Sequence, residues 1–300
     1  MAVKRKSKKK SPAGKKRVGG AALIAFQGMP GAYSHLACRA RFPEMTPLPC
    51  AQFEDAFAAV QTGKARLAMI PVDNSVAGRV ADIHHILPRS GLYIIGEHFQ
   101  PVHHHLLVTP GATLKSLKRV ESHVHALGQC RKFLRKNRLT PIVAADTAGA
   151  AKDVSERKDV TVGAIASQLA AGIYGLKSLA SNIEDAEHNT TRFLIMSRTP
   201  VKVDAKKGGP YITSFVFRVR SVPAALYKAL GGFATNGVNM TKLESYMVGG
   251  HFEAAQFYAD VDGHPDDRPL KLALEDLCFY SRELTILGTY PAHRYRLTSK

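Results

Sequence analysis

The sequence predicts an α/β protein built from two units in series, a region of about 180 residues followed by a smaller one of about 80. Its 300 residues are too many for one typical domain and suit about two. Short apolar runs alternate with helical patterns up to about residue 198. A stretch rich in Pro, Lys and Gly follows at 199–210, and the pattern of strands and helices changes beyond it.

The N-terminal region, 21–200, begins with an apolar run that ends close to a glycine, which is typical of a buried strand. The expected strands are 22–26, 67–72, 92–96, 102–108, 142–145, 160–165 and 193–196, and the expected helices are 34–42, 53–62, 126–136 and 167–174. Alternation of short strands with helices predicts an α/β region.

The C-terminal unit, 211–295, follows a linker at 201–210 and has a different order of elements. Its expected strands are 212–219, 240–248, 252–261 and 284–288, and its expected helices are 224–235 and 270–279. Pro223 suits the first turn of the first helix, Asn236-Gly237 predicts a turn, and Gly249-Gly250 predicts a hairpin turn. The order β-α-β-β-α-β predicts a ferredoxin-like fold.

The net charge of +18 is unevenly distributed along the chain. Residues 1–20 hold nine Lys and Arg and no acidic residue, so we expect a disordered basic tail. Such a tail could bind polyanions, carry a localisation signal, or act only as a solvated segment. Because the tail holds half of the excess charge, we do not expect a nucleic-acid partner.

Other function classes are excluded by composition. No stretch approaches the roughly 18 apolar residues that span a bilayer, and no apolar segment of a secretory signal follows the basic N-terminus. The four cysteines, at 38, 50, 130 and 278, have no spacing typical of a metal site or a disulfide framework. We therefore expect a cytoplasmic protein with reduced thiols and no membrane partner.

Two candidate ligand-binding loops follow expected strands. The segment 27–35, Gln-Gly-Met-Pro-Gly-Ala-Tyr-Ser-His, leads into a helix whose free N–H groups suit a carboxylate or phosphate, or it is a plain turn capped by Ser34. The segment 71–78, Pro-Val-Asp-Asn-Ser-Val-Ala-Gly, places polar residues at the end of a strand, where α/β folds bind ligands, or it forms an Asx-type turn.

Two further segments carry polar side chains of interest. In 121–130, Ser122 could cap a helix that presents Gln129, whereas a Ser–His nucleophile lacks both the G-x-S-x-G turn and a third member. The segment 189–193, Asn-Thr-Thr-Arg-Phe, combines hydroxyls and a guanidinium that suit a carboxylate and a leaving oxygen, or it is a bend with a surface Arg. The histidines at 84–85 and 103–105 have no acidic or cysteine partner at ligand spacing, so we expect no metal.

Taken together, these four segments resemble the prephenate dehydratase family, in the same order over about residues 22–198. The family's glycine loop ending in Tyr-Ser matches 28–34, and its Pro-Val-Glu-Asn-Ser matches 71–75, with Asp73 in place of Glu. Its Ser-His-Pro-Gln-Ala-Leu and Gln-Cys match 122–130, with Val124 and His125 as departures. Its Tyr-Gly-Leu, Asn-Ile-Glu-Asp and Asn-x-Thr-Arg-Phe correspond to 174–176, 182–185 and 189–193.

Residues 212–292 resemble an ACT domain, an amino-acid-sensing module often fused to this enzyme. The family's Gly-Ala-Leu corresponds to 224–226 after Pro223, and its Asn-Leu-Thr-Lys-Ile-Glu-Ser run corresponds to 239–245. Tyr246-Met247 stand where the family usually has Arg-Pro. The resemblance implies L-phenylalanine as the effector and a homodimer or homotetramer, with Ala225, Leu226, Asn236, Gly237, Val238, Asn239, Glu244 and Ser245 at the effector site.

For the catalytic region the resemblance implies two lobes, similar to a periplasmic binding protein, with the active site in the cleft. Prephenate would lose carbon dioxide and its ring hydroxyl there, and no cofactor is implied. Thr191 would act on the leaving hydroxyl, and Arg192 would hold a carboxylate or be structural. The other implied site residues are Asn74, Ser122 and Gln129, which position the substrate with Ser75, and Asp73, Thr190, Phe193, Tyr33 and Ser34.

Three alternatives stay open from the sequence. Arogenate differs from prephenate only by an amino group in place of the keto oxygen, so an arogenate dehydratase is one of them. A ligand-sensing protein without catalytic activity is the second, although Thr191 and Arg192 argue against it. A nucleic-acid-binding protein would depend on the basic tail alone.

Overall fold

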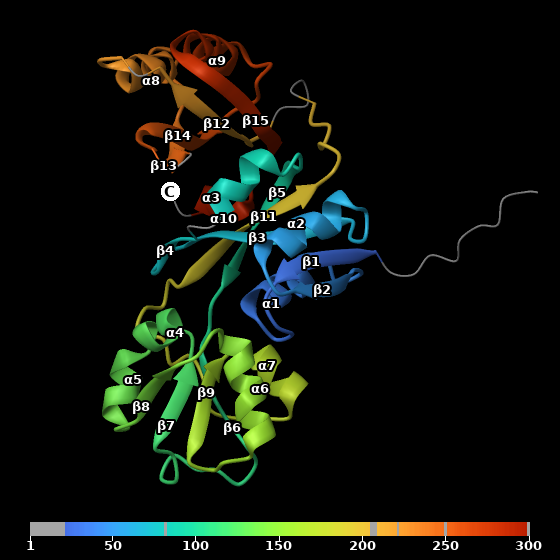
Figure 1. Cartoon of the computed structure of the whole chain (residues 1–300), viewed down its shortest axis with the longest axis vertical. Helices are drawn as coiled ribbons and strands as arrows, with labels where there is room; N and C mark the ends of the chain where they lie inside the picture. The colour runs from blue at the N-terminus through green and yellow to red at the C-terminus, as the bar shows by residue number, and fades with distance from the viewer. Residues whose placement is uncertain (1–21, 81–82, 205–208, 221, 249–250, 299–300) are drawn as a thin grey trace, which may run out of the picture.

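The computed structural model describes residues 22–80, 83–204, 209–220, 222–248 and 251–298. The expected basic tail at 1–20 and the expected hairpin turn at 249–250 lie outside these residues, as does part of the expected linker. The described chain is a mixed α/β fold with three sheets (Figure 1). The first sheet lies in the middle, with the second sheet beyond one end and the third beyond the other.

The first sheet has the strand order β2-β1-β3-β11-β5, and β4 pairs with β3. Its strands are β1 (Leu23–Gln27), β2 (Thr46–Cys50), β3 (Leu67–Asn74), β4 (Gly78–Arg79), β5 (Tyr93–Pro101) and β11 (Thr190–Ser197). Helices α1 (Tyr33–Arg41), α2 (Phe53–Gln61) and α3 (Ile83–Ile86) and the 3₁₀ helix η1 (Leu87–Arg89) connect them. β1 is parallel to β2 and β3, whereas β11 is antiparallel to β3 and β5. We call this part the first half.

The second sheet has the order β10-β6-β9-β7-β8 and forms the second half. Its strands are β6 (His105–Val108), β7 (Arg119–Ser122), β8 (Thr140–Val143), β9 (Val162–Ala166) and β10 (Lys177–Ala180), with helices α4 (Val124–Gln129), α5 (Arg131–Lys136), α6 (Thr147–Arg157) and α7 (Gln168–Tyr174). Its apolar clusters contain only its own residues, so this half has its own core. The chain passes between the halves twice, at 102–104 and 181–189.

Several expected elements differ from the structure. The expected strand 102–108 is interrupted, because β5 continues to Pro101 and β6 begins at His105. The expected helix 126–136 is broken at Cys130, since the Asp185 backbone N–H binds the Gln129 carbonyl and its carboxylate accepts from the Lys132 N–H at the start of α5. Neither expected serine cap is present, because Ala32 and His123 precede α1 and α4 in the cap positions.

The C-terminal unit, 211–298, forms a four-stranded antiparallel sheet in the order β13-β14-β12-β15. Its elements follow the expected order: β12 (Tyr211–Val219), α8 (Ala225–Thr235), β13 (Met240–Val248), β14 (His251–Asp262), α9 (Arg268–Tyr280) and β15 (Ser281–Pro291). A last helix, α10 (Arg294–Thr298), follows. Apolar residues of α8 and α9 form a core with one face of this sheet.

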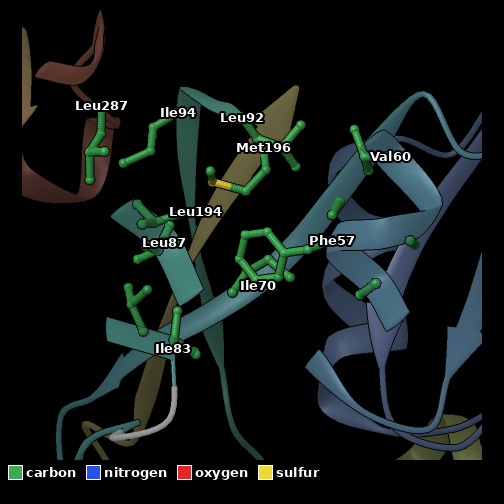
Figure 2. Packing of buried hydrophobic residues seen from close by; sticks show 14 of the residues in the cluster. Phe57, Val60, Ile70, Ile83, Leu87, Leu92, Ile94, Leu194, Met196 and Leu287 are labelled. Carbon is green, nitrogen blue, oxygen red and sulfur yellow. The ribbon is translucent and has the colours of Figure 1, made fainter. Parts of the chain in front are cut away.

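The other face of this sheet packs against the first half. Tyr258 and Leu287 belong to one apolar cluster with Phe57 and Ile94 of the first half. Figure 2 shows Leu287 next to Ile94 at the edge of this cluster. Because the cluster is continuous, the C-terminal unit shares a core with the first half and is not attached by the chain connection alone.

Candidate active site

The segments singled out in the sequence meet where the two halves join. Asn74 ends β3, and Thr191 lies beside it at the start of β11. Gln129 reaches them from α4 in the second half, and His104 and Asn189 reach them from the two connections between the halves. Side chains from five segments therefore form one hydrogen-bonded network.

The orientation of the Asn74 amide is fixed by the backbone. Its Oδ1 accepts from the N–H groups of Val76, at 3.0 Å, and Ala77, at 2.7 Å. Only an oxygen can accept these bonds, so Nδ2 faces the other way. Nδ2 lies 3.0 Å from Thr191 Oγ1 and 2.8 Å from Asn189 Oδ1. Thr191 therefore accepts from Asn74, and its own hydroxyl hydrogen is free to point elsewhere.

The same logic determines the tautomer of His104. Since Asn189 Oδ1 accepts from Asn74, Asn189 Nδ2 donates to Gln129 Oε1 at 2.9 Å. His104 Nε2 lies 2.8 Å from that oxygen and must carry a hydrogen. Burial lowers the pKa of His104, and the nearby His105 and His103 lower it further. The hydrogen bond to Gln129 and the charge of Glu184 raise it, but burial outweighs them. The ring is thus neutral near pH 7, with Nδ1 as an acceptor.

Tyr33 completes the network from the glycine loop. Its hydroxyl lies 2.8 Å from His104 Nδ1 and 2.8 Å from the His103 carbonyl oxygen. Burial, together with Cys130 and Glu184, raises the pKa of Tyr33 well above its usual value, so the hydroxyl stays protonated. Its single hydrogen is shared between His104 Nδ1 and the His103 carbonyl oxygen.

Glu184 holds the first connection between the halves in place. Its carboxylate accepts from the His104 backbone N–H at 2.8 Å and lies 2.9 Å from His103 Nδ1. Burial would raise the pKa of Glu184, but these hydrogen bonds outweigh burial and lower it. Glu184 belongs to the Asn-Ile-Glu-Asp segment, so that segment fixes the position of His104.

The glycine loop also contacts the second half directly. Ser167, the residue before α7, donates to the Gly31 carbonyl at 2.6 Å, and Tyr174 donates to the Pro30 carbonyl at 2.8 Å. Gly31 has φ +94, and a Cβ there would lie 2.9 Å from the Cα and Cβ of Ala170. Only glycine fits this position without a shift of the backbone.

A family model described as prephenate dehydratase matches residues 24–201, which include every part of this network. The chain belongs to the prephenate dehydratase family.

Similar proteins match over most of the chain. A Komagataeibacter europaeus protein named bifunctional N-acyl-homoserine lactone acylase/prephenate dehydratase is 52% identical and covers 92% of this chain and 98% of its own length. The chloroplastic arogenate dehydratase/prephenate dehydratase 1 of Arabidopsis thaliana is 40% identical and covers 89% of this chain and 71% of its own length. The solved structure of the Arthrobacter aurescens prephenate dehydratase in complex with L-Phe is 31% identical, has a TM-score of 0.82 and covers 90% of each chain.

Of the site residues that the prephenate dehydratase resemblance implied, the structure brings Tyr33, Asn74, Gln129 and Thr191 together in the network. Ser75 joins β3 to β11, because its hydroxyl donates to the His188 carbonyl and accepts from the Thr190 N–H.

Three of the implied residues are buried away from this network. The Ser122 hydroxyl donates to the Ile165 carbonyl at 2.6 Å inside the second half. Phe193 packs in the core of the first half with Phe26, and Ser34 is buried at the start of α1.

Arg192 and Asp73 face the C-terminal unit. Arg192 is 6% exposed, and its guanidinium donates to Glu97 and Asp260. Asp73 accepts from Lys242. A cavity of about 330 Å³ beside them also reaches Asn74 of the network. Its lining is residues 73–75, Phe99, Thr190 and Arg192 of the first half and residues 241–242 and 295–296 of the C-terminal unit.

The implied effector residues lie at the two ends of α8, in the turn that follows it and on β13. Gly237 has φ +66 in the turn after α8, and Asn239 donates to Asp262. Glu244 accepts from Lys242, and the Ser245 carbonyl accepts from Arg79 at 3.4 Å. Of the remaining members, Ala225 and Leu226 begin α8, which packs on the sheet, and Asn236 and Val238 follow its C-terminal end.

Sequence reasoning missed His104, Asn189 and Glu184 as site residues. His104 was considered only as a metal ligand, and Asn189 and Glu184 were parts of recognised segments without a role. Among the described residues, no group of three or more His, Cys, Asp and Glu side chains could hold a metal ion, and the expectation of a metal-free site stays a prediction. No helix within the described ranges is long and apolar enough to cross a membrane.

Proposed function

We propose that this chain converts prephenate into phenylpyruvate, carbon dioxide and water. The observation that carries the proposal is the hydrogen bond from Asn74 Nδ2 to Thr191 Oγ1. Because Thr191 uses a lone pair of its oxygen in this bond, its O–H hydrogen can be donated to the departing hydroxyl of the substrate.

The chemistry requires orientation more than acid strength. The bond between the ring and its carboxylate breaks, its electrons enter the ring, and the C–O bond on the opposite carbon breaks as the ring becomes aromatic. The hydroxide that departs takes up a proton that ultimately comes from solvent. A neutral threonine is a poor acid, so its contribution is a hydrogen bond that strengthens as negative charge develops on the leaving oxygen.

The rest of the network would hold this donor rigidly. Gln129 bridges Asn74, Asn189 and His104, so side chains from both halves fix the Asn74 amide. A donor that is already oriented needs no reorganisation in the transition state. Arg192 is assigned a structural role in this proposal, because its guanidinium is occupied by Glu97 and Asp260.

The finer domain organisation is also part of the proposal. We infer a tail at 1–20, a catalytic domain at 21–200 with two lobes similar to a periplasmic binding protein, a linker at 201–210, and an ACT regulatory domain at 211–295. The sheet order and the element order of the C-terminal unit support the last assignment. L-Phenylalanine as the effector is supported by the related Arthrobacter aurescens structure, which is a complex with L-Phe. We further propose a homo-oligomer in the cytoplasm.

Two other activities have specific support. Arogenate is a candidate substrate because the Arabidopsis thaliana relative is named arogenate dehydratase/prephenate dehydratase. Acylase activity toward an N-acyl-homoserine lactone is a candidate because the Komagataeibacter europaeus relative carries that activity in its name. For the acylase, Ser122 is a poor nucleophile, since its hydroxyl is fully buried and bonded to a backbone carbonyl.

The proposal is tested by assaying the purified chain with all three substrates. We expect phenylpyruvate from prephenate, with a kcat/KM that exceeds the value for arogenate. Absence of phenylpyruvate formation, with phenylalanine formed from arogenate, would reassign the chain as an arogenate dehydratase. Fatty acid release that persists in a Thr191→Val variant would show a separate acylase activity.

A further inference from the structure

Asn74 and Thr191, the proposed catalytic groups, each have a sequence neighbour that is ion-paired with the C-terminal unit. Asp73 precedes Asn74 in β3, and Arg192 follows Thr191 in β11. Side chains alternate between the two faces of a strand. A bond that holds Asp73 or Arg192 on one face therefore orients Asn74 or Thr191 on the other.

The first bond joins Asp73 to β13. Lys242 Nζ lies 2.5 Å from Asp73 Oδ1 and 2.7 Å from Glu244 Oε1. Only 13% of the Lys242 side chain is exposed, so solvent screens this pair less than an ordinary surface pair. The bond connects residues that are 169 positions apart in the chain.

The second bond joins Arg192 to β14. Arg192 Nη1 lies 2.6 Å from Asp260 Oδ2, and Nε lies 2.9 Å from Glu97 Oε2. The Ser214 and Tyr258 hydroxyls also donate to Asp260, which is fully buried. Burial alone would raise the pKa of Asp260, but the charge of Arg192 and these two hydrogen bonds lower it, so Asp260 is ionised.

The two ion pairs are connected and form one cluster of charges. Arg192 Nη1 lies 3.6 Å from Asp73 Oδ2, and Lys242 is opposite Asp260 in the β13–β14 register. We call Asp73, Arg192, Lys242 and Asp260 the interunit quartet. Each unit supplies one positive and one negative member. Asp73 is therefore paired with Lys242 across the boundary, and Arg192 with Asp260.

An irregularity in the pairing of β11 with β3 makes these bonds important for the position of Thr191. The pairing of β11 with β3 shifts its register between Arg192 and Phe193, so the strand ladder is irregular next to Thr191. Buried ion pairs contribute little net stability compared with apolar packing. Their directional bonds can nevertheless fix the position of β11 relative to β3, where the register shifts, while β11 there stays regularly paired with β5.

We propose that Lys242 and Asp260 are positioning residues, which hold Asp73 and Arg192 so that Asn74 and Thr191 keep their catalytic geometry. This inference rests on the proposed dehydratase activity. It makes the C-terminal unit part of the machinery that sets kcat, through the bonds of its side chains to Asp73 and Arg192.

The test is a double-variant cycle measured by prephenate turnover. Lys242→Met, Asp73→Asn and their combination are compared with the unmodified chain, and Lys242→Arg tests rescue by a conservative change. Lys271→Met is the matched control, because Lys271 is exposed on α9, the helix on the far face of the C-terminal sheet. Thermal midpoints identify variants that do not fold, and Lys242→Gln replaces Lys242→Met if that variant is unfolded at the assay temperature.

We expect Lys242→Met to lower kcat roughly tenfold to a hundredfold with little change in KM, because a small misplacement of a catalytic group slows chemistry by such factors. Lys242→Arg should recover most of the activity, and Lys242→Met should have little further effect when Asp73 is already Asn. Full activity of Lys242→Met, or equal losses from it in both backgrounds, would overturn the inference. An unmodified chain that does not convert prephenate would instead refute the proposed function.

Discussion

Replacing Thr191 with valine removes one hydroxyl and keeps the shape of the side chain. In the structure this hydroxyl receives one hydrogen bond, from Asn74 Nδ2 at 3.0 Å. Asn74 keeps its bond to Asn189 Oδ1 at 2.8 Å and both backbone bonds to its own Oδ1. The amide should therefore stay in place, and the free energy of unfolding should fall by only about 1 kcal/mol.

The expected loss in turnover is much larger than the loss in stability. Removing one donor that stabilises charge in the transition state lowers kcat by about 10²- to 10³-fold, or about 3–4 kcal/mol. KM should change little, because the hydroxyl acts mainly when the substrate hydroxyl departs. Steady-state formation of phenylpyruvate by the purified Thr191→Val chain measures both values.

Two further variants complete this experiment. Thr191→Ser retains the hydroxyl and should keep most of kcat. Thr190→Val changes the neighbouring residue, whose side chain lines the cavity toward the C-terminal unit, and should be mild. A Thr191→Val variant with kcat within about tenfold of the unmodified chain would remove Thr191 from the mechanism, because the lost donor should cost more than that.

Three other predictions concern pH, metal and regulation. Because burial lowers the pKa of His104, the unfolded chain binds this proton first as the pH falls, so the free energy of unfolding should decrease below the ordinary pKa of about 6.5. Urea denaturation of the unmodified chain and of His104→Gln, each at about pH 5 and about pH 8, should show a smaller decrease in the free energy of unfolding for the variant. An equal decrease in both chains would contradict the lowered pKa of His104. Turnover should survive exhaustive EDTA treatment, whereas activity lost to EDTA and restored by a divalent ion would overturn the metal-free site. L-Phenylalanine should bind in calorimetry and weaken the binding of a substrate analogue by about 1–3 kcal/mol, with the reciprocal effect on its own affinity. Equal affinities in the two titrations would mean binding without regulation.

The sequence allowed much of the fold to be predicted, because most core strands are short apolar runs and most helices have a clear apolar face. The strands that were not expected from the sequence, among them β2, β7 and β10, are of another kind. β2 reads Thr-Pro-Leu-Pro-Cys and lies at the edge of its sheet, where proline is tolerated but propensity gives no strand signal. The second part of β5 carries His98 and Gln100 and has no apolar alternation to reveal it.

The candidate site was predictable where a polar residue directly follows an apolar strand, as Asn74 does, or belongs to a recognisable segment, as Thr191 does. His104 was not, because its role depends on Gln129 and Tyr33, which approach it from different halves. The pairing of Asp73 with Lys242 was equally hidden, since no local pattern links residues so distant in the chain. Partners of this kind become visible only when the sheets are assembled.

Gly31 has a consequence for the size of the ligand that the junction can accept. At this point the two halves are separated by the thickness of a peptide backbone, with Ala170 directly opposite. An alanine at position 31 would act as a spacer between the two halves, because its Cβ would lie 2.9 Å from the Cα and Cβ of Ala170. A variant of this kind would hold the halves farther apart, bind a compact dianion less tightly and leave room for a bulkier ligand. If prephenate binds at this junction, as proposed, the absence of one methyl group limits how large a molecule the site admits.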